Sequence, residues 1–248
     1  MSTGHSRLRF ALLDASHRDP NTRRNFRREL DADLSEFDAT AGELPDDFDF
    51  DGVVVTGSRS SVYWDEDWIE PLVDYVSDAH DAGLPMLGVC YGHQVLATAL
   101  GGRVEGMGEY ELGYREVAHS GDDALFEGIG ETFTAFTTHS DAVVELPPGA
   151  ELVAENDYGV HAFRKGRAWG VQFHPEYDPQ TAESVTRGKD LPEERIESVV
   201  AGIDAENYEA ACEAKRLFDN FVAYAEHVAA DADVDADVTE EPDAELTV

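Results

Sequence analysis

The chain has 248 residues, with 53 Asp or Glu against 18 Lys or Arg, so its formal net charge is -35. A balance this acidic excludes a protein that binds nucleic acid by neutralising phosphates. Hydrophobic residues make up 42% of the chain, which supports a globular domain with an extension. No apolar run reaches the ~18 residues of a membrane span, and no apolar stretch near the start resembles a secretory signal. We therefore expect a cytoplasmic protein without membrane contact.

The basic residues are mostly arginine, because only Lys165, Lys189 and Lys215 are lysines. Self-repulsion at this net charge destabilises the compact state at low ionic strength, and salt screens it. We interpret the composition as halophilic, meaning adapted to a very salty cytoplasm. An acidic protein without salt adaptation is the alternative.

The first part of the chain alternates strand and helix patterns. Strands are predicted at 7–13, 52–56 and 86–89, and helices at 21–30, 66–82 and 92–100. The four arginines of the first helix are interpreted as a solvated, ion-paired face. Strand, helix and strand in this order require a right-handed crossover between parallel strands. The pattern predicts an α/β fold with an open, mostly parallel central sheet flanked by helices.

The rest of the chain is predicted as short strands followed by helices. The strands are expected at 114–117, 133–138, 152–154, 160–164 and 168–172, and the sequence leaves their direction undecided. We expect one domain over 1–227, with an added helical segment at about 181–225 that caps the site or makes a subunit contact. Residues 228–248 alternate alanine, valine and acid, which predicts a disordered tail.

Cys90 lies between Gly88 and Gly92, at the junction of a predicted strand and helix. A sharp strand-to-helix turn holds a nucleophile in a strained conformation, and small neighbours relieve the crowding around it. The thiol would project near the helix amino terminus, where the positive end of the peptide dipoles favours a thiolate. The pattern predicts a nucleophile at the carboxyl end of an internal strand.

A thiolate nucleophile also needs a base that carries a proton to the leaving group. The sequence GVQFHPE at 170–176 supplies His174 at a strand end. Glu176 follows two residues later and can accept a hydrogen bond from one ring nitrogen while the other faces the thiol. We predict a catalytic triad of Cys90, His174 and Glu176, and an oxyanion hole from the amides of Gly57 and Tyr91.

Together these motifs resemble the class I, or triad-type, glutamine amidotransferases, and within them the stand-alone proteins similar to GMP synthase. The resemblance rests on GVCYGHQ around Cys90, QFHPE around His174, the TGS loop at 56–58, EYELGY at 109–114, and the segment His139-Ser140-Asp141. It covers about residues 8–177 and implies a flavodoxin-like arrangement of the sheet.

The resemblance implies hydrolysis of the glutamine side-chain amide through a γ-glutamyl thioester on Cys90, with ammonia passed to an acceptor. The implied substrate contacts are Gln94, Ser140 and Asp141. The chain lacks the GxxxxGK[ST] and SGG patterns of ATP-using loops, so acceptor activation is expected on a separate synthase chain. The identities of the acceptor and of the synthase stay open, as does the oligomeric state.

Some features depart from the resemblance or lie outside it. Ser58 and Arg59 replace a second glycine and a proline of the GMP synthase pattern, so the oxyanion loop is expected to be set differently or to reorganise on partner binding. Cys212 is interpreted as core packing. No cofactor is predicted, and no metal, because the histidines show no metal-ligand spacing.

Two other functions remain open at this point. A γ-glutamyl peptide or amine hydrolase, or a transpeptidase, would use the same cysteine chemistry without a partner. A non-catalytic regulatory module on the same scaffold would predict a broken triad, whereas all three triad residues are present in the sequence.

Overall fold

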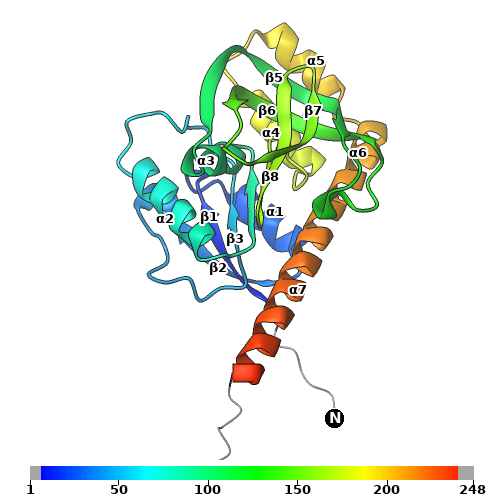
Figure 1. Ribbon diagram of the computed structural model, residues 1–248. Helices are drawn as coiled ribbons and strands as arrows, with labels where there is room; N and C mark the ends of the chain where they lie inside the picture. The colour runs from blue at the N-terminus through cyan, green and yellow to red at the C-terminus, as the bar shows by residue number, and fades with distance from the viewer. Residues whose placement is uncertain (1–6, 240–248) are drawn as a thin grey trace, which may run out of the picture.

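A computed structural model describes residues 7–239 and shows one large sheet between two layers of helices (Figure 1). Within the described residues the sheet has nine strands in the order β2-β1-β3-β4-β9-β8-β7-β5-β6. The strands are β1 (Arg9–Asp14), β2 (Asp33–Asp38), β3 (Gly52–Val55), β4 (Met86–Val89), β5 (Arg103–His119), β6 (Thr132–Glu145), β7 (Glu151–Asn156), β8 (Gly159–Lys165) and β9 (Ala168–Val171). The α/β fold with a central sheet flanked by helices is confirmed.

Half of the sheet is parallel and contains the predicted crossover. β1 pairs in parallel with β2 and β3, β3 with β4, and β4 with β9. Strands β3, β4 and β9 are entirely buried, as expected for strands covered on both faces. The sequence reading missed β2, an acidic strand at the edge of the sheet, where charged side chains are tolerated because one side is unpaired.

The other half of the sheet is antiparallel, which decides the direction that the sequence left open. β8 pairs antiparallel with β9 and β7, and β5 pairs antiparallel with β7 and β6. β5 and β6 are much longer than the expected segments 114–117 and 133–138. Glycines in β5 interrupt its hydrophobic pattern, and a register shift between Gly106 and Glu111 keeps the pairing with β6 intact.

Helices cover both faces of the sheet. They are α1 (Pro20–Glu29), α2 (Ile69–Asp81), α3 (Tyr91–Ala99), α4 (Pro179–Arg187), α5 (Glu193–Ala201), α6 (Ala205–Ala211) and α7 (Arg216–Thr239), with short 3-10 turns η1 (Ala39–Ala41), η2 (Ala124–Phe126) and η3 (Cys212–Lys215). Side chains of α1 and α7 share one core cluster with the sheet, and those of α2 and α3 share the other. Within residues 7–239, no helix is long and apolar enough to cross a membrane.

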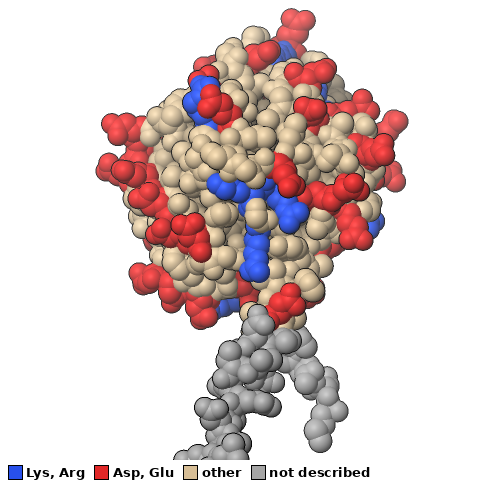
Figure 2. All heavy atoms as spheres, viewed as in Figure 1, with Lys and Arg blue, Asp and Glu red and all other residues tan. Residues whose placement is uncertain are grey.

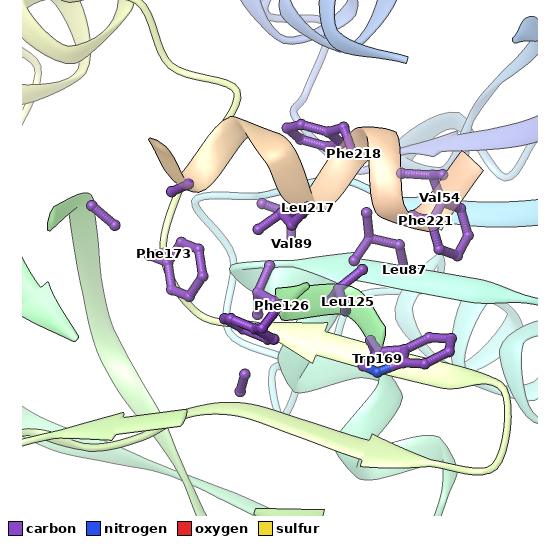
Figure 3. Packing of buried hydrophobic residues seen from close by; sticks show 14 of the residues in the cluster. Val54, Leu87, Val89, Leu125, Phe126, Trp169, Phe173, Leu217, Phe218 and Phe221 are labelled. Atoms are coloured by element: carbon purple, nitrogen blue, oxygen red, sulfur yellow. The ribbon is translucent and has the colours of Figure 1, made fainter. Parts of the chain in front are cut away.

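The long helix α7 packs against the parallel half of the sheet (Figure 3). Its Leu217, Phe218 and Phe221 are buried in the same core cluster as Val54 and Leu87 of the central strands, and the ring of Phe218 contacts Phe26 of α1. The sequence predicts a disordered tail from residue 228, whereas α7 extends as far as Thr239. Residues 240–248 of the predicted tail lie outside the described residues.

The arginines of α1 confirm the interpretation as an ion-paired face, and several of them reach distant parts of the chain. Arg24 and Arg28 both pair with Asp178, at 2.8 and 3.0 Å. Asp178 is also the N-cap of α4, where it accepts hydrogen bonds from the amide and hydroxyl of Thr181. These contacts tie the added helical segment to α1. On the face shown in Figure 2, acidic side chains are spread widely and basic side chains gather near the centre.

Candidate active site

Cys90 occupies a strained turn between β4 and α3. Its φ is 54° and its ψ is -101°, a conformation that non-glycine residues rarely adopt. The backbone amide of Cys90 donates to the carbonyl of Val171 on β9, at 2.8 Å, which fixes the turn against the neighbouring strand. The side chain is buried at the carboxyl end of β4. This is the geometry expected of a nucleophile elbow.

The two glycines beside Cys90 allow the turn to pack against its neighbours. A Cβ added at Gly92 would lie 2.2 Å from the carbonyl oxygen of Val55 on β3. A Cβ added at Gly88 would lie 2.3 Å from the carbonyl oxygen of Gly92. Neither position has room for a side chain, because the obstacle in each case is backbone. The glycines therefore bring α3 into contact with the ends of both strands.

His174 and Glu176 form a buried pair on the segment that follows β9. His174 Nδ1 lies 2.8 Å from Glu176 Oε1, and both side chains are almost completely buried. The ring of Tyr177 stacks on the imidazole, with 4.1 Å between centroids. The amide of His174 donates to the carbonyl of Phe136 on β6, and Arg28 donates to the carbonyl of Glu176. The imidazole is therefore held by its carboxylate partner, by ring stacking and through its backbone.

The charges around His174 favour the imidazolium. Burial by itself lowers the pKa of His174, but the negative charges of Cys90 and Glu176 outweigh it and raise that pKa to about 10. Nε2 of the ring is buried and has no hydrogen-bond partner among the described residues. Because Glu176 occupies Nδ1, Nε2 is the nitrogen that is free to exchange a proton with the sulfur.

All eight site residues predicted from the sequence line one cavity of about 420 Å³. They are Cys90, His174, Glu176, Gly57, Tyr91, Gln94, Ser140 and Asp141. Gly57 lies directly against the side chains of Cys90 and His174, since a Cβ there would be 3.0 Å from His174 Cε1 and 3.7 Å from Cys90 Cβ. Tyr91 is the first residue of α3, where backbone amides have no partner within the helix.

Asp141 connects the loop after β3 with β6. Its carboxylate accepts hydrogen bonds from Ser61, at 2.5 Å, and from Tyr63, at 2.9 Å. Its carbonyl accepts from the side-chain amide of Gln94, at 3.3 Å, and lies 2.9 Å from Nδ1 of His139. The sequence reading did not identify Ser61 or Tyr63, although both lie in the predicted oxyanion loop. These contacts fix that loop relative to the cavity wall.

A second buried cluster lies behind this wall. Glu111 Oε2 is 2.6 Å from Nε2 of His139 and 3.0 Å from Nε2 of His161, and Asn156 donates to Oε1. One ligand atom from each of Glu111, His139 and His161 lies within 4.8 Å of the others, so the cluster has the residue types of a metal site. Because the carboxylate oxygen of Glu111 already accepts hydrogen bonds from both histidine rings, we interpret the cluster as structural. The absence of a metal stays a prediction.

Three side chains of this region are absent from the sequence-based site. Tyr177 follows the HPE motif and could have been chosen as its neighbour. Glu111 falls within the EYELGY stretch, but nothing in the sequence pairs it with His161, because that contact depends on the antiparallel half of the sheet. Lys189 lies in the added segment and lines the cavity. No motif marks it.

A cysteine at a strand-to-helix elbow, beside a buried His-Glu pair that follows the neighbouring strand, defines an α/β protein of the nucleophile-elbow type. Comparison with known proteins identifies the family. The model of the family described as glutamine amidotransferase class-I matches residues 20–188. The chain therefore belongs to the class I glutamine amidotransferase family, which confirms the resemblance seen in the motifs.

Related sequences point to the same family. A glutamine-hydrolysing GMP synthase from Vibrio campbellii is 41% identical over 133 residues, which are 52% of this chain and 25% of that protein. One from Staphylococcus aureus is 37% identical over 129 residues, or 50% of this chain and 24% of that protein. The matched stretch is thus about a quarter of these relatives.

Solved structures support the fold. A glutamine amidotransferase from Thermotoga maritima superposes with a TM-score of 0.73 at 22% identity, covering 88% of this chain and 99% of the other. A Thermoplasma acidophilum protein described as a putative GMP synthase subunit gives a TM-score of 0.67 at 20% identity, with coverage of 92% and 99%.

Proposed function

We propose that this protein hydrolyses the side-chain amide of glutamine and delivers the ammonia to an acceptor on a separate synthase chain. The observation that carries the proposal is the 2.8 Å contact between His174 and Glu176, beside a cysteine held at positive φ. Membership of the class I family supports glutamine as the substrate. The similarity to GMP synthases supports a synthase as partner.

In the first half of the reaction the Cys90 thiolate attacks the carbon of the side-chain amide. The charge on the carbonyl oxygen is stabilised by the backbone N–H groups of Gly57 and Tyr91. His174, protonated and held by Glu176, then gives the Nε2 proton to the departing nitrogen. Ammonia leaves, and the γ-glutamyl group remains bound to the sulfur as a thioester.

In the second half the neutral His174 acts as a base. Its Nε2 takes a proton from water as the water oxygen attacks the thioester carbon. The carbon–sulfur bond breaks, glutamate leaves, and Cys90 returns as a thiolate beside an imidazolium. Glu176 keeps the same ring orientation in both halves, because its hydrogen bond is made by Nδ1 and not by the reacting nitrogen.

Measurement of glutamate and ammonia released from glutamine tests this proposal. The two products should appear in equal amounts with the wild-type chain and be lost with Cys90→Ser. Cys212→Ser is the matched control, because Cys212 is the other free cysteine and lies in η3, outside the cavity. Undiminished activity of Cys90→Ser would contradict the mechanism. Isolation of the protein in high salt, with identification of what co-purifies, tests the synthase partner.

A γ-glutamyl peptide or amine hydrolase is the second candidate, and the cavity gives a reason to keep it. Its volume of about 420 Å³ falls in the range of pockets for ligands of drug size, roughly 300–1,000 Å³, and the added segment lines part of it. This space accommodates a leaving group larger than ammonia. Turnover of γ-glutamyl dipeptides at a rate above that of free glutamine would favour this candidate.

The regulatory-module hypothesis has less support, because the side chains of Cys90 and His174 meet at one point of the cavity: a Cβ added at Gly57 would lie 3.7 Å from Cys90 Cβ and 3.0 Å from His174 Cε1. We further propose that the acidic composition reflects adaptation to a salty cytoplasm.

The division into a domain over 1–227, with an added segment at about 181–225, also stays a proposal. Limited proteolysis in high salt would test that boundary.

A further inference from the structure

Lys189 lies in the link between α4 and α5 and lines the same cavity as Cys90. Its ammonium sits over the ring of Tyr110, 5.1 Å from the centroid. Arg195 of α5 donates to the carbonyl of Tyr110 at 2.5 Å, and the amide of Lys189 donates to the carbonyl of Thr186 in α4. The added helical segment therefore supplies the lysine and also holds the backbone of the tyrosine whose ring the lysine contacts.

The ammonium of Lys189 has no carboxylate partner among the described residues, although the chain contains 53 acidic residues. The other two lysines both have partners. Lys215 pairs with Glu29 at 2.5 Å, and Lys165 donates to the carbonyl of Leu100 at 3.0 Å. Burial lowers the pKa of Lys189, and the charge of Cys90 acts in the opposite direction. A partly desolvated cation without a counter-ion among the described residues thus lines the cavity that contains Cys90.

The position of Tyr110 places this cation near the end of the cavity predicted to receive the amino-acid group. Tyr110 lies in the irregular part of β5, between Gly106, which pairs with Asp141, and Glu111, which pairs with His139. Lys189 is therefore on the wall that carries Ser140 and Asp141. Arg59 also lines the cavity, but it is exposed, so water satisfies its charge.

We propose that Lys189 binds the α-carboxylate of the glutamyl group and so selects for substrates that carry it. The inference rests on the proposed function, since it assigns one end of the substrate whose other end reacts with Cys90. A carboxylate supplies the missing counter-ion, and a charge-assisted hydrogen bond to it is among the stronger polar contacts. Lys189 is a specificity residue contributed by the added segment.

Covalent labelling of Cys90 tests the assignment without requiring turnover. Azaserine is a glutamine analogue that carries the α-carboxylate, whereas iodoacetamide is a neutral thiol reagent without one. The rate of labelling at Cys90 is followed by mass spectrometry for the wild type, for Lys189→Met and for Lys165→Met. Lys165→Met is the matched control, because Lys165 lies on β8 outside the cavity.

We expect Lys189→Met to slow labelling by azaserine about 10- to 100-fold, the range for a lost hydrogen bond between charged groups. Labelling by iodoacetamide should slow much less, since the lost charge then acts only on the thiolate, and Lys165→Met should behave as the wild type with both reagents. Equal azaserine rates for the wild type and Lys189→Met would overturn the assignment. A similar slowing with both reagents would also overturn it, because the lysine would then act on the sulfur and not on the carboxylate.

Failure of the proposed function gives a different result. If iodoacetamide labels Cys90 but azaserine labels neither the wild type nor the variants, the glutamine site itself is wrong, and the assignment is overturned with it. Where turnover is measurable, Lys189→Met should raise KM for glutamine and leave the low rate with γ-aminobutyramide unchanged, since that compound is glutamine without its α-carboxylate. Lys189→Arg should restore part of the loss.

Discussion

Replacement of Glu111 by glutamine should destabilise the protein in a way that depends on pH. Glu111 is fully buried, and burial alone would raise its pKa, but hydrogen bonds from His139 and His161 lower it from 4.5 to about 2. A shift of roughly 2.5 units, at 1.36 kcal/mol per unit, corresponds to about 3 kcal/mol. Because the folded-state pKa is depressed, this stabilisation is present above pH 4.5 and is lost as the pH falls toward 2.

Urea unfolding in concentrated KCl measures this effect. Glu111→Gln should be less stable than the wild type by about 3 kcal/mol at neutral pH, and the difference should shrink to roughly 2 kcal/mol at about pH 3.5. Glu109→Gln is the control, because Glu109 is an exposed acid two residues away on the same strand. A difference that is equally large at both pH values, or close to zero at neutral pH, would refute this account of the cluster.

Three further predictions concern the elbow, the imidazole and the surface. Gly92→Ala should cost about 1–3 kcal/mol in urea unfolding and abolish glutamine hydrolysis, since its Cβ would lie 2.2 Å from the carbonyl of Val55; a stable, active variant would contradict the packing described. On the alkaline side, kcat/KM should fall near pH 10, where His174 loses its proton. Glu176→Gln should move this fall to lower pH, because the variant removes a charge that raises the pKa of His174. A fall at the same pH in both proteins would show that Glu176 does not set the pKa of His174. The Tm of the wild type should rise between low salt and molar KCl as self-repulsion is screened, and a flat profile would argue against salt adaptation.

The parallel half of the fold and the meeting of Cys90, His174 and Glu176 in one cavity could be predicted from the sequence, because both depend on short-range patterns. The buried run 52–56 lies between Gly52 and Gly57, and the run 86–89 follows Pro85, so these residues mark where the strands begin or end. Cys90 and His174 each follow such a run, so the topology of a parallel sheet brings them to the same edge. The pairing of His174 with Glu176 was predictable because the two residues are separated only by Pro175.

Contacts between residues far apart in the chain could not be predicted from the sequence. The direction of the strands after residue 103 is set by tertiary pairing. The length of β5 could not be predicted, because its glycines interrupt the hydrophobic pattern. The same pairing brings Glu111 against His161, and the helix packing brings Lys189 over Tyr110. The acid content of residues 228–248 suggested disorder, and α7 extends into this stretch as far as Thr239.

The most direct test of the central claim is the mass of Cys90 during turnover. Wild-type protein mixed with glutamine and quenched in acid should carry a γ-glutamyl group on the peptide that contains Cys90, and Glu176→Gln should change how much of it accumulates. Release of glutamate by a protein in which that peptide is never modified, even under rapid quenching, would contradict a thioester on Cys90.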